Sequence, residues 1–373
     1  MSLLAMEGFE GMGTTTGSGG ASALQTKLGR LYIGKFSSQG GSDTGFFLTT
    51  NPLGGYALHT GDPAIFGGNQ YVNFWLPSNQ YANTLVVGMR FRMRNSGSGT
   101  QYPIISIYPE NALVQGSASH LALDVCDYTY FKLRRGGSTI LETSSAGLLT
   151  VDQWYHLEFQ FKIGNGTSGA WCMKLDGDVI LQSIGGGDTQ DTTDEVSFIR
   201  IHGLPCNDAT NHPYIIDDLH ILNDQGSQNN TFLGTSTRIK IFYPKGDTTS
   251  FDFTPSTPGE HWPLVDEPDP TVVDYNQGIT NGHKDLYDME NVIDDNVLGV
   301  MAEAIVQQAT EGIRSMRHVV KSGVTTSNGT TTPIMDRNDL TVVRRILDAD
   351  PNTSAYWLPA NLNSAEFGVE VQT

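Results

Sequence analysis

Basic residues are scarce in this chain of 373 residues. Lys and Arg number 22 against 40 Asp and Glu, which gives a formal net charge of −18. A protein that binds nucleic acid through its phosphates needs a basic face, so we expect no nucleic-acid partner. Charged residues of both signs make up only 17% of the chain, whereas Gly is abundant at 42 residues. This composition is typical of a β-rich, turn-rich protein and argues against a helical bundle.

Long apolar runs are missing as well. No stretch approaches about 18 apolar residues, the length of a transmembrane helix, so we expect no membrane insertion. The first residues, MSLLAMEGFEGMG, lack the charged and apolar regions of a secretory signal. We therefore expect synthesis and folding in a cytoplasm.

Cysteine is rare too. The chain has Cys126, Cys172 and Cys206, with long spacings and no CxxC. An odd number of cysteines with these spacings argues against a disulfide framework and against a zinc site. Cys126 and Cys172 alternate with apolar residues in β-type runs, so we expect both to be small buried hydrophobic residues.

Short β-type runs separated by turn clusters fill residues 1–225. In residues 84–93, Val87, Met89, Phe91 and Met93 alternate with the basic Arg90 and Arg92, and Arg94 continues this alternation directly after the run; residues 154–163 alternate in the same way. This period of two is typical of a half-buried antiparallel strand. Further strands are expected at 31–33, 45–48, 68–76, 103–108, 120–125, 130–134, 139–141, 171–175, 179–182, 198–203 and 214–222. So many short strands without a helix predict a mainly β protein with a β-sandwich.

The pattern changes beyond residue 226. Residues 244–283 hold six of the 16 prolines, so we expect residues 226–283 to form an extended Pro-rich arm. Within it, residues 237–243 resemble a strand and residues 244–247 a turn. Residues 284–373 are expected to form a small C-terminal assembly domain, β-rich or α/β. Strands are expected at 317–322 and 365–371 and a helix at 339–349, while 284–292 and 297–308 fit either element.

Five motifs in residues 1–225 stand in a common order. They are Glu7-Gly8-Phe9-Glu10, Phe74-Trp75-Leu76 before the 84–93 strand, Gln153-Trp154-Tyr155-His156-Leu157, Leu175-Asp176-Gly177, and Tyr214-Ile215-Ile216-Asp217-Asp218-Leu219. Together they resemble the concanavalin A-like, laminin-G-like family. That resemblance implies an antiparallel sandwich of the jelly-roll type, in which the closing strand pairs with the first.

A second set of motifs occupies residues 226–373. It comprises Gly246-Asp247, His261-Trp262, Val265-Asp266-Glu267, Asp274-Tyr275, Asp285-Leu286-Tyr287-Asp288, Asp350-Pro351, Trp357 and Glu366-Phe367-Gly368-Val369. This set resembles structural proteins of tailed bacteriophages. The resemblance implies location in a virion, other virion proteins as partners, and a homo-oligomer. Three copies are the first expectation, by analogy with fibre and decoration proteins.

Carboxylates with catalytic spacing are not evident. Glycoside hydrolases with this sandwich carry E-x-D-x-x-E on one strand, because two carboxylates about 5 Å apart do the acid-base work. That pattern is absent, and the adjacent acidic pairs would point to opposite faces of a strand: Asp194-Glu195, Asp217-Asp218 and Asp266-Glu267. Asp176/Asp178 fall in a hairpin turn and Glu267/Asp269 in a Pro-rich loop.

Other enzyme motifs are absent or incomplete. GxSxG, HExxH and the P-loop do not occur. A GxGxxG at Gly164, Gly166 and Gly169 precedes a β-type run instead of a helix, so it predicts a Gly-rich turn. We therefore expect no enzyme, and we assign no catalytic, cofactor-binding or metal-binding residue.

Two ligand hypotheses stay open. Asp217 or Asp218 could hold a structural Ca²⁺, as in laminin-G-like modules, and so could the acid-rich residues 266–295. The alternative is that these acids face solvent. Aromatic candidates for contact with cell-surface carbohydrate are Trp75, Trp171, Tyr128 and Tyr130, although the two Trp are expected in the core. Trp262, Tyr275 and Trp357 are expected to be exposed and to anchor a protein interface.

The functional expectation is a non-enzymatic structural protein of a tailed-phage virion, in the tail, baseplate or fibre. It would act by binding between subunits and by contacts with host glycans. The alternative is a capsid decoration or head-fibre protein. A lectin or hydrolase outside the virion is the remaining hypothesis.

Overall fold

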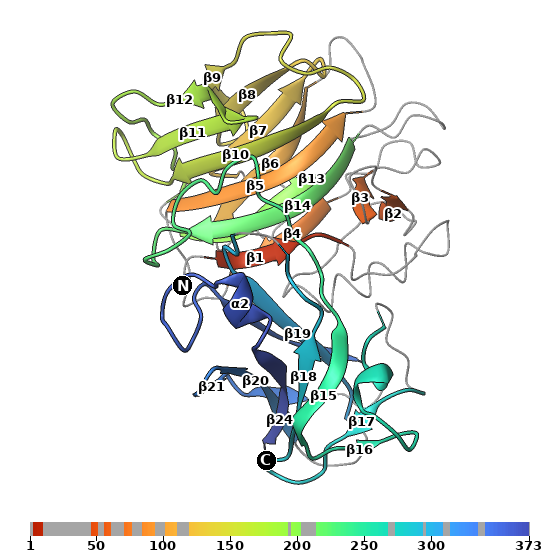
Figure 1. Ribbon diagram of the computed structural model, residues 1–373. Helices are drawn as coiled ribbons and strands as arrows, with labels where there is room; N and C mark the ends of the chain where they lie inside the picture. The colour runs from red at the N-terminus through yellow and green to blue at the C-terminus, as the bar shows by residue number, and fades with distance from the viewer. Residues whose placement is uncertain are drawn as a thin grey trace. The chain divides into compact units, whose positions relative to one another are not determined.

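The chain forms two compact units in a computed structural model (Figure 1). The described residues are 3–9, 46–50, 56–60, 71–76, 84–93, 101–109, 119–192, 195–202, 214–267, 273–293, 296–308, 314–334 and 340–372. The sandwich unit comprises Leu4–Gly226 and Asn230–Ile239. The C-terminal unit comprises Met1–Leu3, Ser227–Asn229 and Lys240–Thr373. The strand expected at 31–33, Arg94 and Cys206 lie outside the described residues.

Two antiparallel sheets build the sandwich unit. Sheet I has eight strands in the order β12 (Asp178–Gln182), β11 (Ala170–Leu175), β10 (Trp154–Lys162), β5 (Thr84–Met93), β14 (Tyr214–Asn223), β3 (Tyr56–Thr60) and β2 (Phe46–Thr50), with β1 (Leu3–Glu7) also on β14. Sheet II has six strands in the order β4 (Tyr71–Trp75), β13 (Val196–His202), β6 (Gln101–Pro109), β7 (Leu121–Cys126), β8 (Tyr130–Arg135) and β9 (Thr139–Thr143). The predicted mainly β fold with an antiparallel sandwich is confirmed, as is the pairing of the first strand with the closing one.

Alternation along the strands fills the core between the two sheets. Val87, Met89 and Phe91 of β5 are at most 1% exposed and belong to the same apolar cluster as Phe159 of β10 and Ile107 of β6. Each such buried side chain contributes about 1.5–3 kcal/mol of hydrophobic free energy. The strands predicted at residues 84–93 and 154–163 are therefore confirmed as β5 and β10, but the prediction that they are half-buried is wrong, because Arg90, His156 and Glu158 on the other face are buried as well.

Residues 230–239 contact the outer face of sheet I. Glu158 of β10 is 1% exposed and accepts the backbone N–H of Leu233 at 2.6 Å and that of Gly234 at 3.2 Å. Arg90 of β5 donates to the carbonyl of Thr235 at 2.5 Å. This segment, which we call the strap, is therefore fastened to the sandwich by charged side chains.

The expectation that Asp217 and Asp218 face solvent is wrong. Both are 3% exposed, at a β-bulge where Asp218 has φ of 51°. Asp218 accepts the N–H of Ile239 at 2.7 Å and lies 3.2 Å from Arg90. Burial raises the pKa of the Asp218 carboxyl, against the opposing effect of these two partners. These acids hold the strap and the bulge in place.

The C-terminal unit is also built from antiparallel strands. Its main sheet has the order β15 (Pro244–Phe251), β18 (Lys284–Met289), β24 (Glu366–Gln372), β20 (Arg314–Ser322) and β21 (Thr325–Asn328), with β22 (Thr332–Ile334) on β20. Two further pairs are β16 (Thr254–Pro255) with β17 (Asn276–Gln277), and β19 (Val300–Val306) with β23 (Thr341–Leu347). The helical elements among the described residues of this unit are the 3₁₀ turn η3 (Trp262–Leu264) and α2 (Pro359–Leu362).

Three sequence predictions fail in this part of the chain. The helix expected at 339–349 is the strand β23, because Thr341, Val342, Val343 and Ile346 are β-branched and the run pairs over seven residues with β19. The strand expected at 237–243 is not one, since the N–H of Ile239 is bound by a side chain of sheet I. The turn expected at 244–247 is the start of β15, with a bulge that accommodates Pro244 and Gly246.

The two ambiguous runs are both strands, β18 and β19. The short run Tyr56–Thr60 (β3) was not expected from the sequence. None of the helices within the described ranges is long and apolar enough to cross a membrane.

Candidate functional site

The outer face of sheet II gathers polar and aromatic side chains from five neighbouring strands. In β13, Ile199 and Ile201 belong to the core, so Phe198, Arg200 and His202 point to the opposite face. The register places Arg200 between Asn73 of β4 and Ser106 of β6, and Phe198 between Trp75 and Tyr108. Asp124 of β7 and Lys132 and Arg134 of β8 continue the same face. We call this set the polar face.

An aromatic row lies along one side of the polar face. The ring of Phe198 lies 4.5 Å from that of Trp75 and 4.7 Å from that of Tyr108, with the Tyr108 ring nearly parallel at 8°. Phe198 is buried, while Trp75 and Tyr108 are half-buried. The row therefore presents flat apolar surface beside polar groups, an arrangement suited to stacking against a ligand ring.

Arg200 is held in the middle of the face by aromatic rings. Its guanidinium carbon lies 3.6 Å from the ring centre of Tyr71 and 4.7 Å from that of Tyr108, and its Nε donates to Asn73 Oδ1 at 2.9 Å. No carboxylate pairs with Arg200 among the residues that the structure describes. Neutral groups therefore orient this cation, and no described carboxylate competes with a ligand for its donors.

His202 adjoins Arg200 and is uncharged at neutral pH. Its Nε2 and the Oγ of Ser106 are 2.9 Å apart, and its ring centre is 6.5 Å from that of Tyr71. Burial, with smaller contributions from Arg200 and Arg134, lowers the pKa of His202 to about 3. A neutral imidazole can accept a proton, but a pKa of about 3 makes His202 a weak base, because general-base catalysis is most efficient when the pKa lies near the operating pH.

The remaining charges on the face are partly balanced. Arg134 pairs with the fully buried Asp124 through its Nε and through Nη2, the latter at 2.8 Å. Lys132 donates to Gln101 at 3.0 Å. With that ion pair set aside, Arg200 and Lys132 give the described part of the polar face a positive charge, in a chain whose net charge is −18.

The aromatic residues named from the sequence are distributed differently from the expectation. Trp75 lies on the polar face and not in the core, whereas Trp171 is buried as expected and donates to Glu142. Tyr128 is buried, and Tyr130 is half-buried at the end of the face. Trp357 is 1% exposed and packs on Phe367 in the core of the C-terminal unit, so its expected interface role is wrong.

Sequence reasoning missed the centre of the face. Arg200, His202 and Tyr108 belong to no motif, because their spacing depends on which strands become neighbours. The one local signal was the alternation of the run Phe198-Ile199-Arg200-Ile201-His202, which places both polar residues on one side of a strand.

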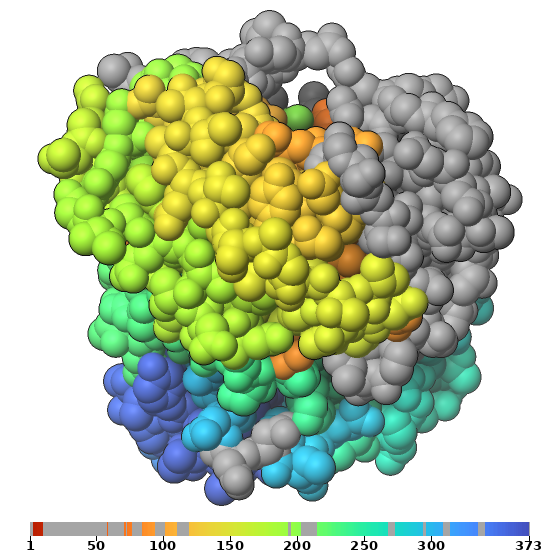
Figure 2. Space-filling view, turned by 90° about the horizontal axis from the view of Figure 1, so that it is seen from above, coloured from red at the N-terminus to blue at the C-terminus, as the bar shows by residue number. Residues whose placement is uncertain are grey.

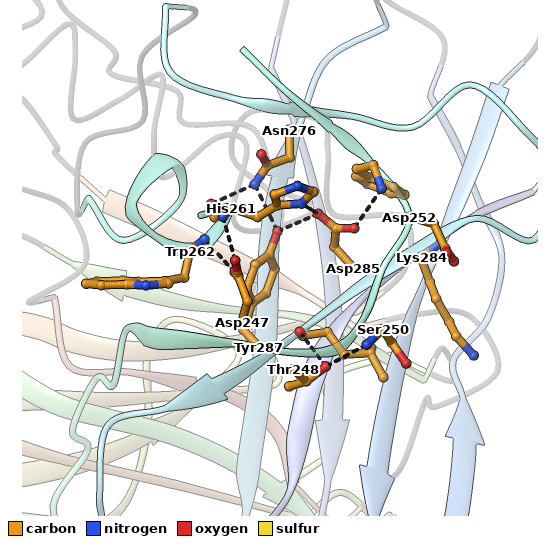
Figure 3. A network of polar contacts seen from close by, with 12 residues as sticks. Asp247, Thr248, Ser250, Asp252, His261, Trp262, Asn276, Lys284, Asp285 and Tyr287 are labelled. Atoms are coloured by element: carbon orange, nitrogen blue, oxygen red, sulfur yellow. Dashed lines mark hydrogen bonds and ion pairs between the residues drawn. The ribbon is translucent and has the colours of Figure 1, made fainter. Parts of the chain in front are cut away.

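A second polar cluster lies in the C-terminal unit (Figure 3). His261 Nδ1 is 2.7 Å from Oδ2 of the fully buried Asp285, whose Oδ1 accepts the N–H of Phe253 at 2.9 Å. Tyr287 donates to Asp285 at 3.1 Å, and burial together with that carboxylate raises its pKa. Asp247 accepts the N–H groups of His261 and Trp262 at 2.7 and 2.8 Å.

This cluster ties β15, η3, β17 and β18 together. Among the described residues, no hydroxyl or thiol of Ser, Thr or Cys bonds to His261, so the His261–Asp285 pair lacks a nucleophile. The residues of the phage-like motifs at 246–247, 261–262 and 285–288 therefore have a direct structural role. They satisfy buried polar groups in the interior of the C-terminal unit.

The other sequence candidates are structural as well. Gly166 has φ of 63°, and Gly164 and Gly169 lie in the turn between β10 and β11, so the Gly-rich turn is confirmed. The part of the chain that the structure describes contains no group of three or more His, Cys, Asp or Glu that could hold a metal. Cys126 is buried and Cys172 half-buried, both as free thiols.

Comparisons with known proteins give structures but no family. No family model matches the chain, and no curated protein matches it. Among solved structures, an endo-β-1,4-glucuronan lyase from Trichoderma reesei is 17% identical over 48% of this chain and 86% of its own, with a TM-score of 0.37. The alginate lyase Aly36B is 12% identical over 58% and 95%, with a TM-score of 0.39. A Trypanosoma rangeli sialidase is 14% identical over 47% and 26%, with a TM-score of 0.32.

These comparisons contradict the prediction of a non-enzymatic structural protein of a tailed-phage virion. The solved structures named above are lyases and a sialidase, and none is a phage structural protein. The physical reason for the error is that the phage-like motifs at 246–247, 261–262 and 285–288 form buried contacts of the C-terminal unit, which carry no information on where the protein acts. At TM-scores below 0.5, the similarity does not transfer any activity to this chain.

Proposed function

We propose that this protein is carbohydrate-active and that its polar face binds an acidic polysaccharide. The observation that supports this most directly is Arg200, a guanidinium stacked between Tyr71 and Tyr108 without a carboxylate partner among the described residues. Its free donors match the fork of a sugar carboxylate. The adjacent aromatic row offers a flat surface for the apolar face of a sugar ring.

Charge favours an acidic ligand over a neutral one. The chain as a whole repels anions, yet Arg200 and Lys132 lie on the same face, and the one acid beside them among the described residues is Asp124, which Arg134 neutralises. A polyanion bound here should be released by added salt. Dissolved ions weaken the attraction between exposed charges, and at 0.1 M ionic strength this attraction decays over a distance of about 10 Å.

The test is a binding titration with alginate as the acidic chain and dextran as the neutral one. We expect alginate to bind, and Arg200→Met to weaken it about tenfold or more, the effect of losing charge-assisted hydrogen bonds. Arg92→Met is the matched control, since Arg92 lies on sheet I and pairs with Asp152 at 2.6 Å. Equal affinity of the wild type and Arg200→Met, or a preference for dextran, would contradict the proposal.

A second candidate function is cleavage of the bound chain by β-elimination. The observation that favours it is the position of His202 beside Arg200 and Tyr71, where a bound sugar carboxylate would raise the pKa of the imidazole from about 3 towards neutral pH. In this reaction a base removes the proton α to the sugar carboxylate, the C–O bond at the β carbon breaks, and a C=C bond forms. The leaving oxygen takes up a proton. Arg200 would stabilise the charge that develops on the carboxylate, and His202 would accept the proton.

The ultraviolet absorbance of the unsaturated sugar end measures this reaction. We expect His202→Gln to abolish product formation from alginate while leaving binding within about threefold, since the base contributes to the transition state and not to ground-state binding. If the wild type binds alginate and releases no unsaturated product, the lyase candidate fails and the binding proposal stands.

A further inference from the structure

A pocket of about 320 Å³ lies at the rim of the sandwich unit, apart from the residues of the polar face. Its lining residues all have polar side chains and come from the end of β8, the turn after β10 and the loop after β12. These residues are Arg135, Asn165, Asp188, Gln190, Asp191 and Thr192. Their segments are coloured yellow to yellow-green, and atoms of these colours lie at the surface in Figure 2. We call it the rim pocket.

Buried hydrogen bonds hold the walls of the rim pocket in place. Thr189 is fully buried; its hydroxyl donates to the carbonyl of Lys162 at 2.7 Å and accepts the N–H of Gly164 at 2.9 Å. His120 is also fully buried, and its Nδ1 accepts the N–H of Asp191 at 3.1 Å. The loop that carries Asp188 to Asp191 is therefore fixed on both sides, so the pocket is formed before any ligand arrives.

The Gly-rich turn is part of this wall. Gly169 pairs with Gly187 through an isolated bridge, and a Cβ on Gly169 would come within 2.2 Å of Thr189 Oγ1 and 2.4 Å of the Gly187 carbonyl. A Cβ on Gly186 would come within 2.0 Å of the Thr167 carbonyl. Glycine is required here because two loop backbones meet without space for side chains.

The chemistry of the lining excludes two kinds of ligand. Arg135 pairs with Asp188, so with Asp191 the pocket carries a net charge of about −1, which disfavours an anion such as phosphate. A hard cation would take six to eight oxygen ligands, and of the two carboxylates one is already paired with Arg135.

A polyol satisfies the same groups. Amides at Asn165 and Gln190 both donate and accept, the carboxylates of Asp188 and Asp191 accept, and the guanidinium of Arg135 donates. Asp188 Oδ2 pairs with Arg135 and Asp188 Oδ1 is buried, so the exposed Asp191 is the carboxylate that a ligand hydroxyl can reach. The volume is at the lower end of the range for ligand pockets, about 300 Å³, which suits one ring and not a chain.

We propose that the rim pocket binds a single neutral sugar ring, as a site separate from the polar face. None of the described residues that line the pocket is aromatic, so the affinity comes from hydrogen bonds and is low, with a Kd of about 1 mM. The proposal does not depend on the acidic polysaccharide, because it uses none of the residues of the polar face.

Saturation-transfer NMR on the full chain tests the site, with methyl glycosides of glucose, galactose, mannose and N-acetylglucosamine as probes. We expect at least one to bind, and Gln190→Ala to weaken it about tenfold through the loss of an amide. Asn165→Trp, a substitution at an exposed turn, fills the pocket and should abolish the signal. Gln182→Ala is the control, since Gln182 is an exposed residue of β12 outside the pocket.

The outcomes separate the two sites. Binding that is lost in Asn165→Trp and retained in Gln182→Ala and Arg200→Met supports the rim pocket. Binding lost in Arg200→Met assigns the sugar to the polar face and overturns the proposal. Absence of binding by all four probes overturns it as well, and so does displacement of the bound sugar by Ca²⁺ or inorganic phosphate through the pocket residues.

Discussion

Two histidines of the sandwich unit are kept neutral by burial. Burial lowers the pKa of His156 to about 4, with Glu158 opposing that effect, and lowers the pKa of His202 to about 3. Their usual pKa is 6.5, so below that pH the unfolded chain takes up protons that the folded chain does not. Stability is therefore fully present above pH 6.5 and falls as the pH is lowered towards 3.

We expect the thermal unfolding midpoint of the sandwich unit to decrease as the pH is lowered from 6.5 to 4. His156→Gln or His202→Gln should flatten this dependence, because each removes one group with a depressed pKa. His283→Gln is the control, since His283 is half-exposed and its side chain makes no hydrogen bond among the described residues. An unchanged pH slope in both variants would contradict the assignment of neutral buried histidines.

In the C-terminal unit, the buried carboxylate of Asp285 is a hydrogen-bond partner of three other buried groups. Its carboxylate satisfies Phe253 N–H, His261 Nδ1 and the Tyr287 hydroxyl, all buried (Figure 3). Asp285→Ala leaves these groups without a partner, and we expect a loss of about 3 kcal/mol in the free energy of unfolding. Urea denaturation measures it. Asp288→Ala, at an exposed position of the same strand, should change stability by less than about 0.5 kcal/mol.

At the scale of elements, close pairing of strands decides which glycines are replaceable. Gly368 of β24 lies against β18, where a Cβ would come within 1.8 Å of the Asp285 carbonyl. Gly246 of β15 has a negative φ, and a Cβ there would meet the side chain of Asp288 at an ordinary 3.8 Å.

We therefore expect Gly368→Ala to lower the free energy of unfolding by about 1–3 kcal/mol, since backbone must move to admit the methyl group. Gly246→Ala should be neutral within about 0.5 kcal/mol. Chemical denaturation of both variants checks the pair, and equal effects would show that β24 and β18 are not packed as described.

At the scale of the whole molecule, the strap belongs to the sandwich although it lies beyond the last strand of that unit in sequence. Glu158, Asp218 and Arg90 bind its backbone from three different strands of sheet I. The free energy of unfolding of a fragment of residues 1–239 should thus exceed that of a fragment of residues 1–226 by about 2 kcal/mol. In the longer fragment, Glu158, Asp218 and Arg90 retain their hydrogen bonds to the backbone of the strap. Urea midpoints that coincide for the two fragments would show that the strap is dispensable.

Assembly of several copies remains a prediction. The sequence analogy favoured a homo-oligomer with three copies, and multi-angle light scattering of the purified chain measures the number directly. A monomeric mass would remove this expectation.

The sequence by itself determined the class of fold and most strands of the sandwich. Alternating runs such as residues 84–93 and 154–163 need no partner to be recognised, because the period of two is local. Only the tertiary structure decided what local propensity left ambiguous, as in residues 341–347, where pairing with β19 makes a strand. It also decided both candidate sites. Arg200, Asn73 and Tyr108 come from three strands, and the residues of the rim pocket come from three separate segments. Neither site can therefore be predicted from the spacing of residues along the chain.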